Sequence, residues 1–282
     1  MGKSRGRNGG AVPAGKLPGL LRVHPGEHVR LRDGDAARRF GWTEEEAGPE
    51  LVRMKARLGE LQYKLYADGR FGLLIVLQAL DGGGKDSTIR HVCSAFNPQG
   101  CTVTAFKAPS AEELKHDYLW RVHQRVPGRG EVGIFNRSHY EDVLVVRVDS
   151  LAPKNVWQRR YDEINAFEQQ LVHADIGVVK IFLHISRDEQ KRNFQQRLDD
   201  PRKHWKFDPA DLKKREQWPA YQRAFEDVFR RCSTADAPWY AVQSDHKWVR
   251  DLVVARILLD ALEALPLKWP KPKYDPGKIR LE

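Results

Sequence analysis

The sequence predicts an α/β fold in which a five-stranded parallel sheet carries helices on both faces. Apolar segments of strand length alternate with longer helical segments along the chain, which is the pattern of βαβ units. Segments such as Val178–Leu183 are almost continuously apolar, as expected for strands that are buried on both faces. Polar clusters follow three of the predicted strands, at the sheet edge where ligands bind in such folds.

The elements are predicted in the following order. Residues 1–20 form a disordered basic tail, since the first sixteen are rich in Gly, Arg and Lys. A single domain covers residues 21–265, and residues 266–282 form an extended tail rich in Pro and Lys. The first long helix begins at the capping box Thr43–Glu46 and ends at Asp68-Gly69. The predicted strands are Leu73–Ala79, Thr102–Phe106, Glu131–Phe135, Val178–Ile185 and Trp239–Gln243. The other helices are one that starts at the Ser110–Glu113 capping box, then Asn155–His173, Arg187–Asp199, Asp211–Arg231 and about Trp248–Leu265.

Composition limits the class of protein. The 282 residues include 48 Lys and Arg against 38 Asp and Glu, so the net charge is +10. Such a charge favours a polyanionic partner, such as nucleic acid, an acidic membrane surface or polyphosphate, but also fits a solvated basic face. The apolar runs are too short to span a bilayer, and Met1–Lys16 lacks the apolar region of a secretory signal. Three cysteines without zinc spacing indicate a reducing cytoplasm.

A glycine-rich loop after the first predicted strand indicates a phosphate site. Gly82, Gly83 and Gly84 let the backbone approach an anion closely, and Lys85 adds a positive charge at the start of a helix. The usual spacing is G-x-x-x-x-G-K-[ST], and this chain departs from it. Ala79 stands at the first glycine and Asp86 at the hydroxyl, although Ser87 and Thr88 follow at once. The alternative is a glycine-rich turn with an exposed lysine.

The third predicted strand ends in a second polar cluster. Asn136 stands where the neighbouring strand of P-loop enzymes usually ends in an Asp that helps to hold Mg²⁺, so the metal must depend more on Asp81. Arg137 is placed to clamp a transferring phosphate or to form a surface salt bridge. Glu141 lies near the next helix start, where it reaches the same edge or favours the helix electrostatically.

A basic stretch after the fourth predicted strand indicates a helical lid over residues 187–215. Arg187, Lys191 and Arg192 share or flank one helix face, and a Pro-containing loop follows. A lid of this kind excludes water and neutralises charge on a transferring group, whereas the alternative is a solvated charged face. Trp205 stacks on a base or packs the lid shut, and packing is favoured. The histidines are scattered and form no metal cluster.

Together these segments resemble the polyphosphate kinase 2 family, from about Leu51 to Leu265. Several motifs in the right order are more specific than the loop alone. They are Asp81–Thr88, Phe135–Tyr140, Arg187–Arg197, Asp200–Lys206, Trp218–Ala224, Pro238-Trp239 and Asp245–Lys247.

The resemblance implies a thymidylate-kinase-like P-loop fold of three layers with a helical lid. It also implies phosphoryl transfer between inorganic polyphosphate and AMP or ADP, giving ADP or ATP, with Mg²⁺ or alternatively Mn²⁺. By the same resemblance, the protein forms a homodimer or homotetramer, Asp81 holds the metal and Asn136, Arg137 and Glu141 bind the nucleotide. The implied phosphate and polyphosphate ligands are Gly82, Gly83, Gly84, Lys85, Asp86, Ser87, Thr88, Arg187, Lys191, Arg192 and Lys203. Asp81, Lys85, Arg137 and Glu141 are the implied catalytic residues.

Two residues differ from those of many family members, and they bear on which nucleotide accepts the phosphate. Many family members have Gly in place of Ala79 and Asp in place of Asn136, and the Asn136–Glu141 form resembles the subgroup that accepts AMP as well as ADP. An ATP-dependent nucleoside monophosphate kinase is the alternative enzyme. A basic nucleic-acid-binding protein, suggested by the charge and by Trp269, Lys271 and Lys273, is the non-enzymatic alternative, although no nucleic-acid motif is found.

Overall fold

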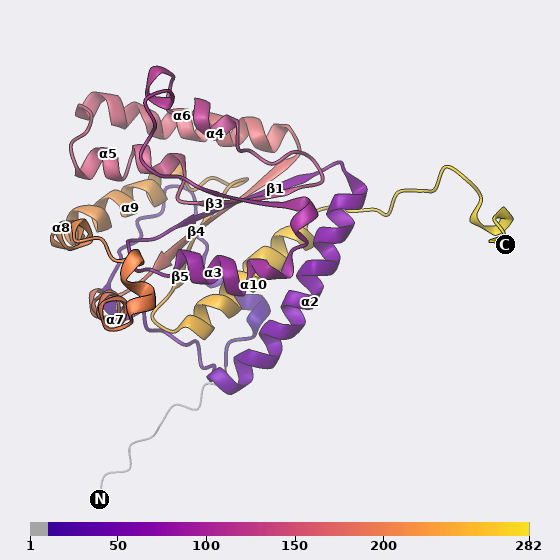
Figure 1. Cartoon of the computed structure of the whole chain (residues 1–282), viewed down its shortest axis with the longest axis horizontal. Coiled ribbons are helices and arrows are strands. Elements are labelled where there is room, and N and C mark those ends of the chain that lie inside the picture. Colours follow the sequence, from indigo (N-terminus) through magenta and orange to yellow (C-terminus); the bar gives the residue numbers. More distant parts are fainter. Residues whose placement is uncertain (1–10, 282) are drawn as a thin grey trace, which may run out of the picture.

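The computed structural model describes residues 11–281, so the first ten residues of the predicted tail lie outside the described chain. Its centre is one sheet of five parallel strands in the order β2-β3-β1-β4-β5 (Figure 1). The strands are β1 (Gly72–Gln78), β2 (Cys101–Ala105), β3 (Val132–Asn136), β4 (Ile176–His184) and β5 (Trp239–Gln243). All five predicted strands are present, with bounds that differ by two residues or fewer, so the predicted fold class is confirmed.

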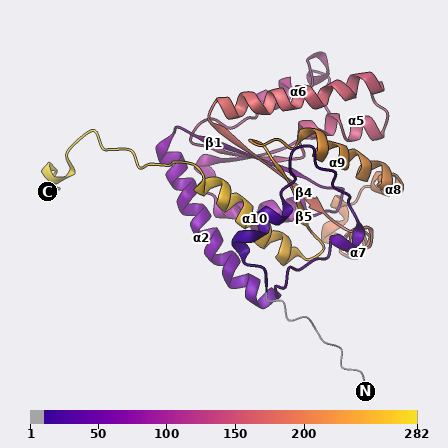
Figure 2. The same ribbon diagram turned by 180° about the vertical axis from the view of Figure 1, so that it is seen from behind.

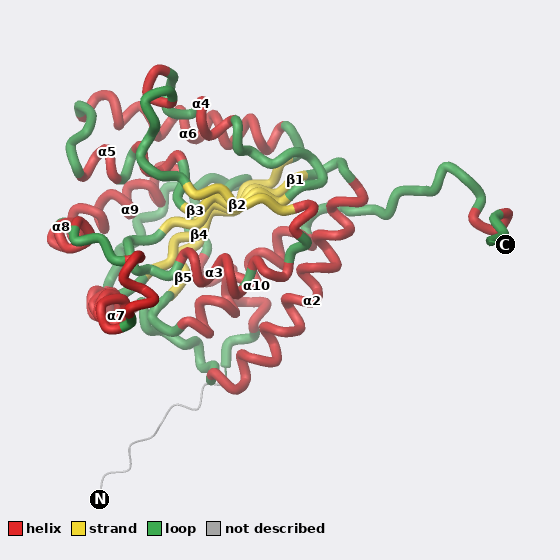
Figure 3. Tube along the Cα trace, viewed as in Figure 1, coloured by secondary structure: helices red, strands yellow, loops and turns green. Residues whose placement is uncertain are grey.

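One face of the sheet is covered by the N-terminal helices and the last helix (Figures 1 and 3). These are α1 (Leu17–Leu21), α2 (Glu44–Asp68), α3 (Lys85–His91) and α10 (Lys247–Glu263). The capping box of Thr43 and Glu46 begins α2 as predicted, and Gly69 ends the helix in a left-handed conformation. The stripe of Met54, Leu58 and other apolar residues packs on α10, which is why this long helix lies flat on the domain.

The opposite face is covered by α6 (Lys154–His173) and α9 (Trp218–Cys232), seen from behind in Figure 2. The short helices α4 (Trp120–His123) and α5 (Val145–Val148) lie on the same side. Aromatic side chains fill this layer, where Phe182 of β4 contacts Phe225 with a ring-centroid distance of 4.2 Å. Two covered faces explain why β1 is buried at every position.

The lid lies beyond the carboxyl ends of the strands. It consists of α7 (Arg187–Asp199), the 3₁₀ segment Pro201–Lys206 and α8 (Ala210–Glu216). The single predicted helix Asp211–Arg231 is instead divided into α8 and α9 at Gln217. Pro219 lies in the first turn of α9 and has no N–H group to continue a hydrogen-bonded helix from α8.

Two other predictions differ from the structure. The helix predicted at Ser110 is only one 3₁₀ turn, Glu113–Lys115, although the bonds of the capping box form. Leu114 is 70% exposed, so this segment has no buried face that would extend the turn into a helix. Residues 14–20 of the predicted disordered tail are also ordered, because Leu17 is buried in the core beneath α10.

The described C-terminal segment leaves the domain after Leu267, and Lys268 donates a backbone hydrogen bond to Asp68. Among residues 11–281, no helix has the length and apolar character needed to cross a bilayer.

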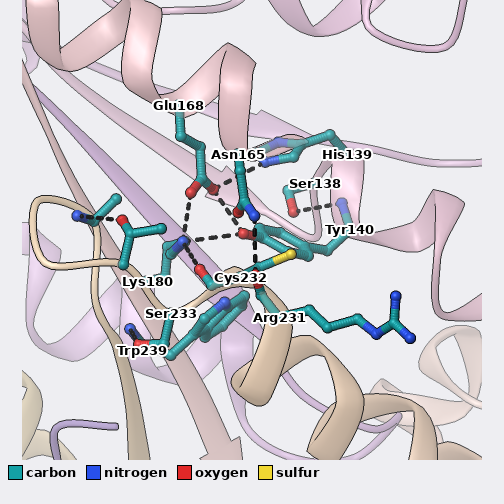
Figure 4. A network of polar contacts seen from close by, with 12 residues as sticks. Ser138, His139, Tyr140, Asn165, Glu168, Lys180, Arg231, Cys232, Ser233 and Trp239 are labelled. Carbon is teal, nitrogen blue, oxygen red and sulfur yellow. Dashed lines mark hydrogen bonds and ion pairs between the residues drawn. The ribbon is translucent and has the colours of Figure 1, made fainter. Parts of the chain in front are cut away.

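A buried ion pair joins β4 to α6 under the aromatic layer (Figure 4). Lys180 of β4 is fully buried and donates to Glu168, to the Tyr140 hydroxyl at 3.1 Å and to the Cys232 carbonyl at 2.6 Å. The Tyr140 hydroxyl donates in turn to Glu168 at 2.8 Å. Burial acts to raise the pKa of Glu168, but Lys180 and His139 outweigh it and hold the pKa below its ordinary value.

We expect Lys180→Met to lower the free energy of unfolding by about 3–5 kcal/mol, because it leaves the carboxylate of Glu168 buried without its counter-ion. Urea denaturation followed by tryptophan fluorescence measures this loss. The double variant Lys180→Met/Glu168→Leu removes both charges and should recover at least half of it. A single variant as stable as the wild type would contradict the assigned role of the pair.

Candidate active site

The loop between β1 and α3 has the backbone of an anion site. Gly82 and Gly84 have positive φ values of 80° and 96°, which disfavour any residue with a Cβ. Gly83 has no such φ, but an added Cβ would lie 2.6 Å from the Cβ of Ala79. The three glycines therefore fix a tight turn whose backbone is open to a ligand at the start of α3.

Lys85 begins α3 beneath this turn. Lys85 is only 8% exposed, and its ammonium group donates to the Ala79 carbonyl at 2.9 Å. Burial, reinforced by the nearby charge of Arg137, lowers the pKa of Lys85 from 10.5 to about 8. A bound anion beside the ammonium group would favour its charged form and raise this pKa again.

Arg137 follows β3 in a left-handed backbone conformation, with φ of 62°. Such a conformation is unfavourable for arginine and persists only where neighbouring contacts impose it. Ser138 accepts from Gln78 at 3.2 Å and from the Tyr140 N–H at 3.2 Å, and Tyr140 is held by the buried Glu168. The buried network thus anchors the segment that presents Arg137 to the loop.

Asp81 is the ionic centre of the site. Its carboxylate pairs with Arg137 and, at 3.2 Å, with Lys214 of α8, while Arg137 also contacts Glu141 at 3.3 Å. Burial acts to raise the pKa of Asp81, but Arg137, Lys85 and Lys214 outweigh it, so the pKa lies below its ordinary value. Asp81 therefore stays ionised and holds cations from two separate elements together.

The lid also contacts the loop backbone. Gln190 of α7 donates to the Asp81 carbonyl at 2.6 Å, and Asn193 donates to the Gly82 carbonyl at 3.1 Å. Arg215 of α8 donates to Gln190 at 2.9 Å, so the two lid helices are joined where they meet the loop. These bonds place the lid directly over the predicted phosphate site.

A cleft of about 1090 Å³ lies between the loop, the end of β3 and the lid. Among residues 11–281, eleven lysine and arginine side chains line it, against six acidic ones. The predicted site residues that line it are Asp81, Gly82, Gly83, Gly84, Lys85, Asp86, Ser87, Asn136, Arg137, Glu141 and Lys203. Its excess of positive charge fits a polyanionic ligand.

Other predicted ligands do not reach this cleft. Arg187, Lys191 and Arg192 are exposed and do not line it, so their assignment as polyphosphate ligands stays a prediction from the sequence. The buried residues of α7 are Gln190 and Phe194. Asn193 and Arg197 lie next to them on the side of α7 that lines the cleft. Thr88 is fully buried and donates to the Gly84 carbonyl, beneath the loop.

Asn136 and Ser87 form hydrogen bonds around the start of α3, whereas Trp205 lies exposed in the lid. The Asn136 amide donates to Asp86 at 2.8 Å, which ties the end of β3 to the first turn of α3. Ser87 donates back to the Gly84 carbonyl at 3.0 Å. Trp205 is 78% exposed and lines the cleft, so the favoured expectation that it packs the lid shut is wrong.

Sequence reasoning missed several cleft residues, above all Lys214, Arg197 and Arg250. Lys214 lies between Lys213 and Arg215, and nothing in this basic run shows which side chain faces Asp81. Arg197 follows Phe194 by three residues, so the single phenylalanine of α7 was a usable signal for a neighbouring inward position. Arg250 lies in a helix whose other residues are mainly apolar, which concealed it.

The carboxylates of the cleft are the groups that could hold Mg²⁺. No cluster of three His, Cys, Asp or Glu side chains suited to a metal occurs within residues 11–281. Mg²⁺ in phosphotransfer sites is held by one or two carboxylates together with substrate phosphates, and Asp81 beside the loop meets that need. Asp211 lies close by, where burial and the charge of Asp81 raise its pKa to about 6. These residues fit a metal that arrives with phosphate.

The comparisons with known proteins agree with this geometry. Residues 42–268 match the family described as Polyphosphate kinase 2 (PPK2). The chain is 47% identical over 263 residues to an AMP/ADP-polyphosphate phosphotransferase of Meiothermus ruber, covering 93% of this chain and 98% of the relative. It is 42% identical to an ADP-polyphosphate phosphotransferase of Rhodopseudomonas palustris, covering 89% and 91%.

A solved structure supports the same assignment. The crystal structure of Polyphosphate Kinase 2 from Arthrobacter aurescens TC1 superposes with a TM-score of 0.89 at 43% identity, covering 95% of this chain and 96% of that one. The family match spans most of the chain and includes the loop, the end of β3 and the lid. On this evidence the chain belongs to the polyphosphate kinase 2 family.

Proposed function

We propose that this protein moves a phosphate between inorganic polyphosphate and AMP or ADP, giving ADP or ATP. The observation that carries the proposal is the junction at Asp81, where Arg137 and Lys214 meet beside Lys85 and the glycine loop. The names of the relatives from Meiothermus ruber and Rhodopseudomonas palustris support the choice of substrates.

Phosphoryl transfer requires positioning and charge neutralisation rather than covalent chemistry by the protein. The loop and Lys85 would hold the phosphates of the donor, and Arg137 with Glu141 would orient the acceptor. Lys203 and Lys214 of the lid would neutralise charge on the transferring group and exclude water. Because the lid already contacts the loop through Gln190, little movement is needed to enclose the reacting phosphates.

We include Mg²⁺ in the proposal, with Asp81 as its protein ligand and Mn²⁺ as an alternative. The metal would supply positive charge to the phosphate oxygens. The use of AMP besides ADP rests on Asn136 and Glu141. A cytoplasmic location and a homodimer or homotetramer stay predictions from the sequence.

The first test is an acceptor screen with purified protein, Mg²⁺ and polyphosphate, using AMP, ADP, GMP and GDP. We expect ADP or ATP to form from the adenine nucleotides, with ATP in place of polyphosphate supporting much less phosphorylation of AMP. Lys85→Met should reduce kcat at least about 100-fold, because it removes the positive charge next to the loop that would hold the transferring phosphate. If AMP were phosphorylated with ATP as the donor but not with polyphosphate, the protein would be a nucleoside monophosphate kinase instead. If no nucleotide were phosphorylated with either donor, both enzyme hypotheses would be rejected.

The two faces of the lid provide a matched pair of variants. Lys203→Gln removes a cleft-lining charge, whereas Lys191→Gln removes an exposed charge on α7 that does not line the cleft. We expect the KM for polyphosphate to rise about 3–10-fold in the first variant and to stay within twofold in the second. Equal effects of the two substitutions would mean that the binding face of the lid is not the one seen here.

The pKa of Lys85 predicts a pH dependence of polyphosphate binding. With a pKa of about 8, the Lys85 side chain carries its positive charge below pH 8 and loses this charge as the pH rises above 8. Each pH unit above 8 should therefore weaken binding of a long-chain polyphosphate by up to about tenfold. Isothermal titration calorimetry in buffers of different ionisation enthalpy should detect proton uptake on binding. The Lys85→Met variant should lose this uptake, and if it does not, the titrating group is another residue.

A further inference from the structure

Arg250 is a buried arginine on the side of the cleft formed by α10. Arg250 is only 1% exposed, yet it lines the cleft beside the glycine loop. Charged side chains are rarely buried to this extent unless they are paired or bind a ligand. The partners of its guanidinium therefore decide what it does.

The guanidinium is satisfied on one edge only. Nε and Nη2 both donate to Oδ1 of Asp251, at 2.9 and 2.7 Å. The other oxygen of Asp251 faces Nδ1 of His91 at 3.1 Å, so this carboxylate is held from both sides. Within residues 11–281, no group accepts a hydrogen bond from Nη1 of Arg250. The fixed edge sets the plane of the guanidinium, and its free edge is left for another acceptor.

The free edge lies against the loop. A Cβ added to Gly84 would be 2.3 Å from Nη1 of Arg250, so only glycine leaves room for this approach. Gly84 is the N-cap of α3, where the backbone N–H groups of the first turn have no partners within the helix. Nη1 and these N–H groups therefore border the same part of the cleft.

Two further basic residues line the cleft on the helices beside Arg250. Lys247 lies one turn earlier on α10 and Arg90 lies on α3, and both line the cleft. These two helices cover the face of the sheet opposite to α6 and α9. Arg137 and Glu141, in contrast, approach the loop from the end of β3. The α3–α10 side thus offers an anion path that is separate from the proposed acceptor residues.

We propose that Arg250 is a phosphate-binding residue on the donor side, with Nη1 donating to an oxygen of the polyphosphate chain next to Gly84. Asp251 fixes the guanidinium for this contact, and Lys247 and Arg90 receive the phosphates that follow along the chain. The proposal rests on the proposed function for the identity of the donor, but the anion contact itself does not depend on turnover.

The kinetic test compares two identical substitutions on one helix. Arg250→Lys keeps the charge and removes the contact at Nη1, whereas Arg256→Lys alters an arginine that pairs with Asp260 and Glu263 and does not line the cleft. We expect the KM for polyphosphate to rise at least about tenfold in Arg250→Lys, with the KM for AMP and ADP within twofold. Arg256→Lys should leave both values unchanged. A KM for polyphosphate within twofold of wild type in Arg250→Lys, or an increase confined to the nucleotides, would overturn the assignment.

Two measurements keep the proposal independent of activity and of the folding of the variant. Calorimetric titration with inorganic tripolyphosphate, without nucleotide, should show at least about tenfold weaker binding to Arg250→Lys, even if the wild type proves to have no phosphotransferase activity. A crystal structure of the wild type with tripolyphosphate should place Nη1 about 2.7–3.2 Å from a phosphate oxygen. A bound tripolyphosphate with no oxygen within hydrogen-bonding distance of Nη1 would refute the contact.

Discussion

The site depends on one carboxylate, Asp81, because it joins the loop to both of the elements that face it. Its side chain holds Arg137 from the end of β3 and Lys214 from the lid, and its carbonyl accepts from Gln190 of α7. Without this negative charge, the cations of an otherwise strongly positive cleft would repel one another in the absence of ligand. Asp81 is therefore the counter-ion that holds the cations of the loop, of the β3 end and of the lid together.

The ion pairs of Asp81 affect how the site would bind phosphate in the proposed reaction. Under the proposal, phosphate oxygens that enter the cleft would compete with Asp81 for Arg137 and Lys214, which would leave the Asp81 carboxylate available to hold Mg²⁺. The buried Lys85 is subject to the same balance, because its pKa is lowered by burial and by the charge of Arg137. Anion binding and protonation of the site are therefore expected to be linked.

The positions of these side chains are set away from the cleft. Arg137 adopts an unfavourable backbone conformation because the next three residues are fixed by Gln78 and by Glu168. Glu168 is itself held by Lys180 of β4, so the geometry at the end of β3 depends on an ion pair in the layer beneath α6 (Figure 4). Buried polar networks of this kind fix orientation, since every member has few alternative partners.

The sequence by itself determined the strands, the glycine loop and the residues that end β3. Local patterns carry this information, because the apolar runs, the capping boxes and the glycine spacing each act within a few residues. Only the tertiary structure decided which charges face the ligand. Helix α7 carries charged residues on both flanks of its buried positions, Gln190 and Phe194. Phe194 marks Arg197 as a neighbouring inward position, but only the packing shows that this flank faces the cleft while Lys191 is exposed. Lys214 and Arg250 are more than a hundred residues from the loop that they face. Their roles follow from packing, because a side chain becomes a ligand-binding group only when distant elements bring it to the same space.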